Sequence, residues 1–308
     1  MPVVTEGSIV AGIDGSRPAR TAALWAADDA SLRGLPLRLV HVYRVPVAKM
    51  SGVLPPEDAI RAGFARQGQE WVSQAREAIL SRFPKLVVET AVREWSAVPA
   101  LIQESTTATM VVLGSRGLGG FTGPLIGSTA VSLARDGHCP IVVARGRRPE
   151  DPLPEKGGIV VGTDGSPTSE AALGFGFDEA RLRDTELIVV RTWSEVFDHG
   201  AIRPHFLDVD AARIESDERK SVEEQVAPWR DKYPEVPVQV VVRRGRPIRT
   251  LLEFGTRARL VVVGCRGRGG FEGMLLGSTS QALVAHAECP VAVIRPAEPI
   301  ETDVDARS

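Results

Sequence analysis

At two places in the chain an apolar run leads into a set of spaced glycines, and a serine follows the last glycine of the set. This combination is well suited to binding a phosphate. The first set has the spacing Gly114-x2-Gly117-x9-Gly127-Ser128, and the second repeats it from 264 to 278. Glycines let the backbone approach an anion closely, so that successive N–H groups can form a phosphate nest. The serine after each last glycine is predicted to open a helix, whose free N–H groups would add to the same site.

Charged residues accompany each glycine set. Arg116 and Arg266 lie inside the two glycine segments, where a guanidinium can pair with phosphate oxygens. Asp14 and Asp164 end an early apolar run in each half, and a carboxylate there can accept from ribose hydroxyls or help to hold Mg²⁺ on a triphosphate. The alternatives are plain turns for the glycines, a helix cap for each aspartate and a solvent-facing Arg116. Because both halves keep the same set, we favour the phosphate site.

The chain contains the same pattern twice, 150 residues apart. Residues 9–16 (IVAGIDGS) return as residues 159–166 (IVVGTDGS), and 13 of 19 positions are identical between 111–129 and 261–279. We therefore predict two domains of ordinary size, at residues 1–148 and 157–297. A proline-rich linker at 149–156 would join them, and a polar tail at 298–308 would follow.

Short β-branched runs alternate with segments of helical periodicity in each half. In the first half we predict strands at 9–13, 37–43, 86–92, 110–113 and 140–144, and helices over 22–30, 67–82, 98–102 and 128–135, with Gly137 at a helix C′ position. The proline-rich residues 44–63 are typical of an irregular surface segment. The alternation predicts an α/β fold of two doubly wound domains, each with a five-stranded parallel sheet and helices on both faces. Such sheets bind ligands beyond the carboxyl ends of their strands, where both glycine segments begin.

The composition is that of an ordinary globular protein. The formal net charge is −2 and 43% of the residues are hydrophobic, so no global field favours nucleic acid or an anionic membrane. The sequence has no run of 18 apolar residues and no basic start followed by an apolar core, which predicts a cytoplasmic protein without a membrane span. The three cysteines match no disulfide framework or metal motif, and we expect buried thiols in a reducing compartment.

These residues together resemble the universal stress protein family in its tandem form, with two such domains in one chain. Both halves meet the family signature G-x2-G-x9-G-[ST], and the Gly-x-Asp at 12–14 and 162–164 and residues 39–42 match as well. The resemblance implies ATP binding at each glycine segment, Asp14 and Asp164 near ribose or Mg²⁺, and Val42 against the adenine. It also implies pairing of domains through their last strands, within one chain or in a homodimer, and a protein partner that the sequence does not name.

The residues that the resemblance places at the nucleotide lie at matching positions in the two halves. They are Gly12, Asp14, Val42, Gly114, Ser115, Arg116, Gly117, Gly119, Gly120, Gly127, Ser128 and Thr129 in the first half, and Gly162, Asp164, Thr192, Gly264, Cys265, Arg266, Gly267, Gly269, Gly270, Gly277, Ser278 and Thr279 in the second.

The second half departs from the first in ways that predict unequal sites. Thr192 replaces Val42, which makes the base pocket more polar. Cys265 replaces Ser115 and puts an oxidisable thiol near the phosphates. Residues 245–247 (GRP) follow the family pattern, whereas the first half has 95–97 (WSA) there. The two sites need not have equal affinity.

The leading hypothesis is an ATP-binding regulatory protein of the stress response whose partner binding depends on nucleotide occupancy. The alternative is a slow ATPase or nucleotidyl hydrolase. Hydrolysis needs a base or a water-orienting residue, and neither His41 nor His138 is repeated in the second half, so we expect it to be slow or absent. A flavin or redox protein is a third hypothesis, which rests on Cys265 alone.

Overall fold

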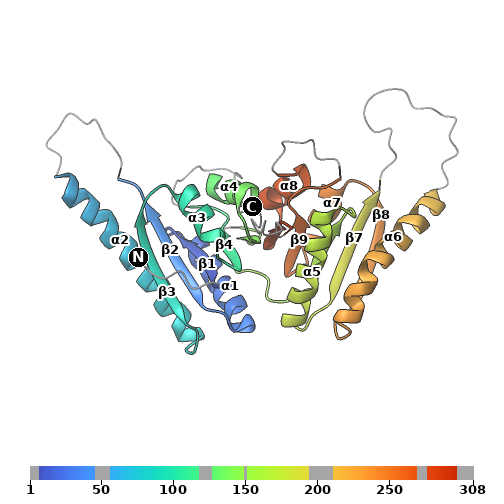
Figure 1. The fold of residues 1–308 in the computed structure, drawn as a ribbon, viewed down its shortest axis with the longest axis horizontal. Coiled ribbons are helices and arrows are strands. Elements are labelled where there is room, and N and C mark those ends of the chain that lie inside the picture. The colour runs from blue at the N-terminus through green and yellow to red at the C-terminus, as the bar shows by residue number, and fades with distance from the viewer. Residues whose placement is uncertain are drawn as a thin grey trace, which may run out of the picture.

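A computed structural model describes residues 7–45, 56–117, 127–148, 151–193, 211–268 and 276–296. These residues form one ten-stranded sheet (Figure 1) with the strand order β3-β2-β1-β4-β5-β10-β9-β6-β7-β8. The strands are β1 (Ile9–Ile13), β2 (Leu37–Tyr43), β3 (Val88–Glu94), β4 (Met110–Gly114), β5 (Ile141–Ala144), β6 (Ile159–Thr163), β7 (Leu187–Trp193), β8 (Val238–Arg244), β9 (Leu260–Gly264) and β10 (Val291–Ile294). The helices are α1 (Arg17–Arg33), α2 (Glu57–Arg82), α3 (Ala97–Ser105), α4 (Ser128–Asp136), α5 (Pro167–Leu182), α6 (Ala211–Lys232), α7 (Pro247–Gly255) and α8 (Ser278–His286).

The sheet consists of two parallel halves joined by one antiparallel pair. Within each half the five strands are parallel, as predicted, and their order is that of a doubly wound domain. The last strands β5 and β10 pair antiparallel, with Val291 opposite Val143. The pairing of last strands therefore occurs inside one chain. Because β5 and β10 each have a neighbour on both sides, neither offers a free edge for the homodimer that the sequence led us to expect through these strands.

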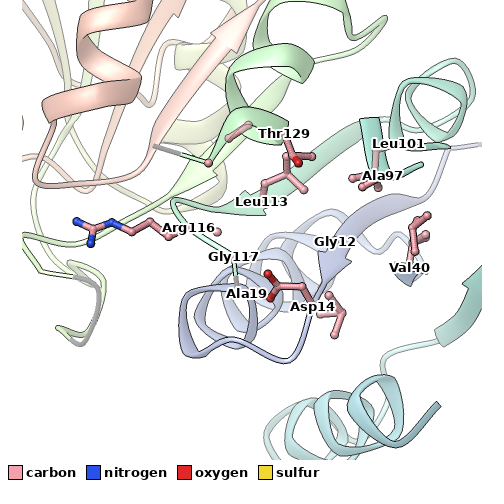
Figure 2. A pocket seen from close by; sticks show the side chains of 15 residues that line it. Gly12, Asp14, Ala19, Val40, Ala97, Leu101, Leu113, Arg116, Gly117 and Thr129 are labelled. Atoms are coloured by element: carbon pink, nitrogen blue, oxygen red, sulfur yellow. The ribbon is translucent and has the colours of Figure 1, made fainter. Parts of the chain in front are cut away.

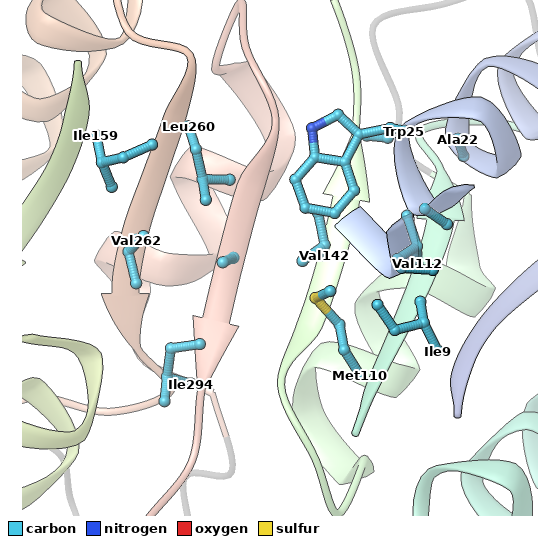
Figure 3. Packing of buried hydrophobic residues seen from close by; sticks show 14 of the residues in the cluster. Ile9, Ala22, Trp25, Met110, Val112, Val142, Ile159, Leu260, Val262 and Ile294 are labelled. Atoms are coloured by element: carbon cyan, nitrogen blue, oxygen red, sulfur yellow. The ribbon is translucent and has the colours of Figure 1, made fainter. Parts of the chain in front are cut away.

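Helices cover both faces of the sheet, as predicted. α1, α2, α5 and α6 contribute to one hydrophobic cluster, and α3, α4, α7 and α8 contribute to a second one on the opposite face. Each cluster runs through both halves of the chain. In the first cluster Trp25 of α1 lies near Val142 of β5, close to the boundary between the halves (Figure 3). Among the described residues, no helix combines the length and the apolar character needed to cross a membrane.

Some predicted boundaries are wrong. The second helix was expected over 67–82, but α2 begins at Glu57, inside the segment that we expected to be irregular. Its start is favoured by Pro56 at the N-cap position and by two acidic residues in the first turn. β3 covers Val88–Glu94 rather than 86–92, because Leu86 belongs to the preceding turn and its amide donates to Phe83 O. Residues 46–55 lie outside the described part of the chain.

Gly137 does not have the left-handed conformation expected of a C′ glycine. It follows α4 with φ −66°, which any residue can adopt. The glycine is needed for a different reason, since an ideal Cβ would lie 2.7 Å from Ile141 Cδ1 and 2.8 Å from Leu133 O. The chain therefore passes from α4 into β5 too closely for a side chain.

Candidate functional site

The carboxyl ends of β1 and β4 are adjacent, and a turn after β1 leads into α1 there. β1 and β4 are neighbours although β2 and β3 come between them in sequence, so the strand order reverses at this point. The turn contains Asp14, Gly15 and Ser16. Gly15 has φ +84°, and the Trp71 ring lies 2.4 Å from the place of an ideal Cβ, so only glycine fits. Ser16 Oγ accepts an N–H of the first turn at 3.2 Å and caps α1.

Asp14 lies against the glycine segment that follows β4. The Ser16 amide donates to Asp14 Oδ1 at 2.9 Å. Asp14 Oδ2 lies over Gly117, where an ideal Cβ would be only 2.3 Å away. Gly114 is similarly close to the start of α1, since a Cβ there would lie 2.7 Å from the carbonyl carbon of Pro18. Both glycines are required because the backbone and Asp14 approach them so closely.

A cavity of about 120 Å³ opens beside this turn (Figure 2). Val42 and other apolar side chains line one part of it, and Asp14 lies at another. Figure 2 shows Asp14 beside Gly117 and the apolar Val40 and Leu101 further along the cavity. The cavity thus combines an apolar part with a carboxylate and a glycine backbone. The residues predicted from the sequence that line it are Gly12, Asp14, Val42, Gly114, Arg116, Gly117, Gly127 and Thr129.

Helix α4 begins at this cavity. Gly127 and Thr129 line it, and no side chain caps the first turn of the helix. The Gly127 amide donates to Ser115 O at 3.1 Å, which holds the start of α4 against the glycine segment. The following N–H groups and the positive end of the helix dipole face the cavity and suit an anion.

Three predicted residues have less direct positions. Arg116 extends away from Asp14 and from the apolar side chains in Figure 2. Ser115 is 6% exposed and buried beneath the segment. Ser128 is exposed at the start of α4. None of the three side chains is therefore a direct lining group of the apolar part of the cavity.

In the second half Asp164 occupies the position of Asp14 and accepts hydrogen bonds at both carboxylate oxygens. The Ser166 hydroxyl donates to its Oδ1 at 2.6 Å, the Ser166 amide at 3.0 Å, and the Arg268 amide donates to its Oδ2 at 2.7 Å. Burial opposes ionisation of Asp164, but these hydrogen bonds outweigh it and hold the pKa of the carboxyl below its usual value. Gly267 again lies under the carboxylate, with an ideal Cβ 2.4 Å from Oδ2.

Hydroxyl groups replace apolar ones around the second site. Thr163 stands at the position of Ile13, and its hydroxyl lies 3.2 Å from Ser169 Oγ and 3.1 Å from Gln225 Oε1. Ser280 stands at the position of Ala130 and donates to Gly264 O at 2.7 Å. The second site is therefore more polar than the first beyond the single change at Thr192 that the sequence indicated.

Cys265 is fully buried, and only its backbone takes part in the glycine segment. Its carbonyl accepts from the Gly277 amide at 2.8 Å, while its side chain lies in the hydrophobic cluster beneath. A thiol in that position does not reach a phosphate. The feature that favoured a redox protein therefore belongs to the core.

The other predicted residues of the second half that the structure describes lie at one edge of the sheet. Gly162, Gly264, Arg266, Gly277 and Thr279 lie at the carboxyl edge of the second half, as predicted, and Ser278 is exposed there. Within the described ranges, no group of three or more His, Cys, Asp or Glu could hold a metal ion. Four of the predicted site glycines lie outside the described residues: Gly119, Gly120, Gly269 and Gly270.

Sequence reasoning missed the small and branched apolar residues of the cavity. Val40 precedes Val42 by two residues, and the alternation of a strand could have identified it as a neighbour on the same face. Ala97 and Ala130 have no comparable sequence signal, because they lie at the starts of two different helices, α3 and α4, which the fold brings together at the cavity. The lining residues that the sequence did not single out are Ile13, Ala19, Val40, Ala97, Leu101, Leu113 and Ala130.

Comparison with known proteins identifies the family. The model of the universal stress protein family matches residues 7–145 and again residues 158–295. The chain belongs to the universal stress protein family. It is 40% identical over 291 residues to universal stress protein Rv2005c of Mycobacterium tuberculosis (strain ATCC 25618 / H37Rv), which covers 93% of this chain and 96% of the relative. It is 36% identical over 291 residues to universal stress protein Rv2623 of the same organism, with the same coverage.

A solved structure shares the tandem arrangement of this universal stress protein. A universal stress protein from Archaeoglobus fulgidus DSM 4304 superposes with a TM-score of 0.67, at 19% sequence identity, over 94% of this chain and 98% of that one. At this identity the likeness concerns the fold. The family match in both halves confirms the tandem form that the repeated glycine signature predicted.

Proposed function

We propose that this universal stress protein binds ATP, with the cavity of the first half as its principal site. The observation that carries the proposal is the cavity itself, which joins an apolar part containing Val42 to Asp14, a glycine backbone and the uncapped start of α4. An adenine fits an apolar pocket, a ribose hydroxyl can donate to a carboxylate, and phosphates suit glycine amides at a helix start. The adenine, the ribose and the phosphates would thus each lie against groups of matching chemistry, in the order in which they are joined.

Magnesium would accompany the triphosphate. Asp164 has a lowered pKa and is ionised at neutral pH, as a magnesium ligand must be, and Asp14 stands at the matching position. One carboxylate together with phosphate oxygens and water is a usual way for a protein to hold Mg²⁺, so a cluster of acidic residues is not required. Magnesium would neutralise phosphate charge at the glycine segment.

The nucleotide would act as a regulatory ligand. ATP bound between β1, β4 and α4 would contact the glycine backbone and thereby change the surface offered to a protein partner. At about a thousand times its dissociation constant a ligand stabilises the state that binds it by about 4 kcal/mol. This is sufficient to switch an interface when the two states differ in affinity. Since β5 and β10 are already paired with each other, any homodimer would use a surface other than the last strands.

Hydrolysis is a weaker proposal. The repeated acids at the two sites are Asp14 and Asp164, and both bind backbone amides of their own turns. A turnover above about 1 per second, the low end of typical enzymes, would contradict the regulatory function. The buried, unpaired cysteines suit a reducing compartment such as the cytoplasm, where ATP is abundant.

The experiment is to purify the protein without added nucleotide, denature it, and quantify the released nucleotide per chain. Gly117→Ala and Gly267→Ala each place a methyl group within 2.4 Å of the facing aspartate, so each should empty its own site. Gly63→Ala is the matched control, because nothing lies within 4 Å of a Cβ there. Asp14→Asn changes the first site without adding an atom to the backbone.

We expect ATP in the wild type and in Gly63→Ala, and a loss in Gly117→Ala and Asp14→Asn with unchanged circular dichroism. If the wild type releases no nucleotide, and takes up none when ATP and Mg²⁺ are added back, the glycine segments are structural turns and the proposal is wrong.

A further inference from the structure

Arginines crowd the carboxyl edge of the second half. Arg243 and Arg244 end β8, Arg246 and Arg249 flank the start of α7, and Arg266 and Arg268 follow β9. The side chains of all six are exposed. The edge is therefore strongly basic although the whole chain has a net charge of −2.

The register of the sheet brings these arginines to the mouth of the second site. Val263 of β9, Gly162 of β6, Val190 of β7 and Val241 of β8 form one row across four parallel strands. Two residues further along the four strands lie Cys265, Asp164, Thr192 and Arg243. The arginines that end β8 and follow β9 therefore lie at the same edge of the sheet as the candidate site. Three strand spacings separate β9 from β8, which is roughly 14 Å. The start of α7 lies between them, because α7 contacts β6 and β7.

The first half lacks this charge at four of the six matching positions, while Arg93 and Arg116 match Arg243 and Arg266. The residues 150 positions before Arg244, Arg246, Arg249 and Arg268 are an acid, a serine, a proline and a leucine. They are Glu94, Ser96, Pro99 and Leu118. The two sites thus differ in the charge at their mouths as well as in polarity.

Part of this charge is not used for internal ion pairs. Arg243 pairs with Glu253 at 3.1 Å and lies over the Phe254 ring. Arg268 binds the Gly165 carbonyl through Nη2 at 3.3 Å. Within the described ranges, neither Arg249 nor Arg266 forms an ion pair. At least two guanidinium groups and the uncapped start of α7 therefore remain available to an anion.

We propose that the mouth of the second site binds a linear inorganic polyphosphate. Guanidinium groups are weakly hydrated and bind phosphate through two parallel hydrogen bonds, so an arc of them selects for several phosphates in a row. The inference extends the proposed function by giving the second site its own ligand class. It depends on that function only in placing phosphates at the glycine segment.

The test is titration calorimetry of the full chain with pyrophosphate, tripolyphosphate and a longer linear polyphosphate, at low and at physiological ionic strength. The variant Arg246→Ser/Arg249→Ala/Arg268→Leu removes three arginines of the mouth, two of them by substituting the residue of the first half. The control Arg219→Ser/Arg230→Ser/Arg257→Ser removes the same charge from α6 and from the turn before β9, away from the mouth. The lysine variant Arg246→Lys/Arg249→Lys/Arg268→Lys keeps the charge but not the paired geometry.

We expect affinity to rise with chain length, and the mouth variant to bind tripolyphosphate at least about tenfold more weakly than the control variant, since charge-assisted contacts are lost. The lysine variant should lie between them. Equal weakening in the mouth and control variants, or no change in either, would overturn the proposal, and so would tighter binding of a single-stranded oligonucleotide with the same number of phosphates. Repeating the titration in Gly117→Ala separates the two proposals, because that change abolishes ATP binding at the first site and leaves the arginines intact.

Discussion

The carboxylate of Asp29 and the guanidinium of Arg183 lie 3.0 Å apart, and both side chains are fully buried although they belong to different halves of the chain. Glu179 and Arg33 stand at the matching positions, 150 residues away, and also form an ion pair across the boundary. Within each helix Arg33 pairs with Asp29 at 2.8 Å and Arg183 with Glu179 at 2.8 Å. The two halves are therefore joined by a closed quartet of two acids and two arginines as well as by β5 and β10.

Aromatic rings complete the quartet. Arg183 lies over the Trp25 ring at 5.1 Å and Arg33 over the Phe175 ring at 5.8 Å. Trp25 and Phe175 again stand 150 residues apart, so each arginine of one half is covered by the equivalent ring of the other. Cation–π contacts of this kind strengthen when they are removed from water. The arrangement keeps the approximate two-fold symmetry of the molecule.

Loss of Arg183 should destabilise the whole chain. Arg183→Met leaves two buried carboxylates with one arginine, which costs about 3–5 kcal/mol when a buried pair is broken on one side. Arg181→Met is the control, since Arg181 lies on the same helix with a 42% exposed side chain and should cost less than about 1 kcal/mol. Chemical denaturation followed by circular dichroism measures both. Equal midpoints for the two variants would show that the quartet contributes little to stability.

The quartet should also make stability depend on pH. Burial and the nearby Asp29 raise the pKa of Glu179 to about 7, although Arg183 and Arg33 act in the opposite direction. A carboxyl whose pKa is higher in the folded state binds its proton more tightly there. Its stabilising contribution is complete below the unfolded value of 4.5 and is lost as the pH rises through about 7.

The measurement is the denaturation midpoint between about pH 5 and pH 8 for the wild type and for Glu179→Gln. The wild type should lose stability relative to the glutamine variant as the pH rises over this range, because glutamine carries no charge to bury. Glu170→Gln, an exposed change in the first turn of the same helix, should follow the wild type. Parallel curves for all three proteins would mean that Glu179 stays ionised throughout.

A glycine and a tryptophan in the second half replace a leucine and an isoleucine of the first. An ideal Cβ on Gly174 would lie 2.4 Å from Trp229 Cη2, and the matching residues are Leu24 and Ile79. Gly174→Leu should therefore cost at least about 1–3 kcal/mol through overpacking, even though leucine is the better helix former. Trp229→Ile alone should leave a cavity and also destabilise.

The double change Gly174→Leu/Trp229→Ile should recover much of the loss, because it rebuilds the packing of the first half. A double-mutant cycle measured by denaturation gives the coupling between the two positions. Additive effects would show that the α5–α6 contact adapts to either residue independently of its partner.

The fold was predictable from the sequence because each pattern occurs twice, once in each half of the chain. Short apolar strands such as 9–13 and 159–163 and the glycine segments fixed the strand–helix alternation and the edge at which the site lies. The pairing of β5 with β10 followed only from the family resemblance, since nothing in four apolar residues identifies the neighbour of a strand. The start of α2 at Glu57 was not predictable, because the first turns of this helix are exposed and carry no hydrophobic pattern.

The quartet and the cavity lining were not predicted, for a related reason. Asp29 and Arg33 have the spacing of an ordinary exposed helical ion pair, and only the docking of α1 beside α5 buries them. Ala97 and Ala130 are unremarkable until two helix starts bring them to Val42. A sequence signal did exist for the quartet, because an acid followed by an arginine four residues later recurs after 150 positions.

The thiols should be unreactive in the folded protein. Burial raises the pKa of Cys139 and that of Cys289 to about 12, and Cys265 is fully buried. Since the thiolate is the reactive form, a thiol reagent should modify the native chain far more slowly than the denatured one, in which all three cysteines should react. The measurement is the number of thiols modified per chain with and without denaturant. Cys265→Ser serves as the matched control, because serine stands at that position in the first half. Rapid modification of one native thiol, abolished by Cys265→Ser, would show that the second glycine segment opens in solution and would restore the redox hypothesis.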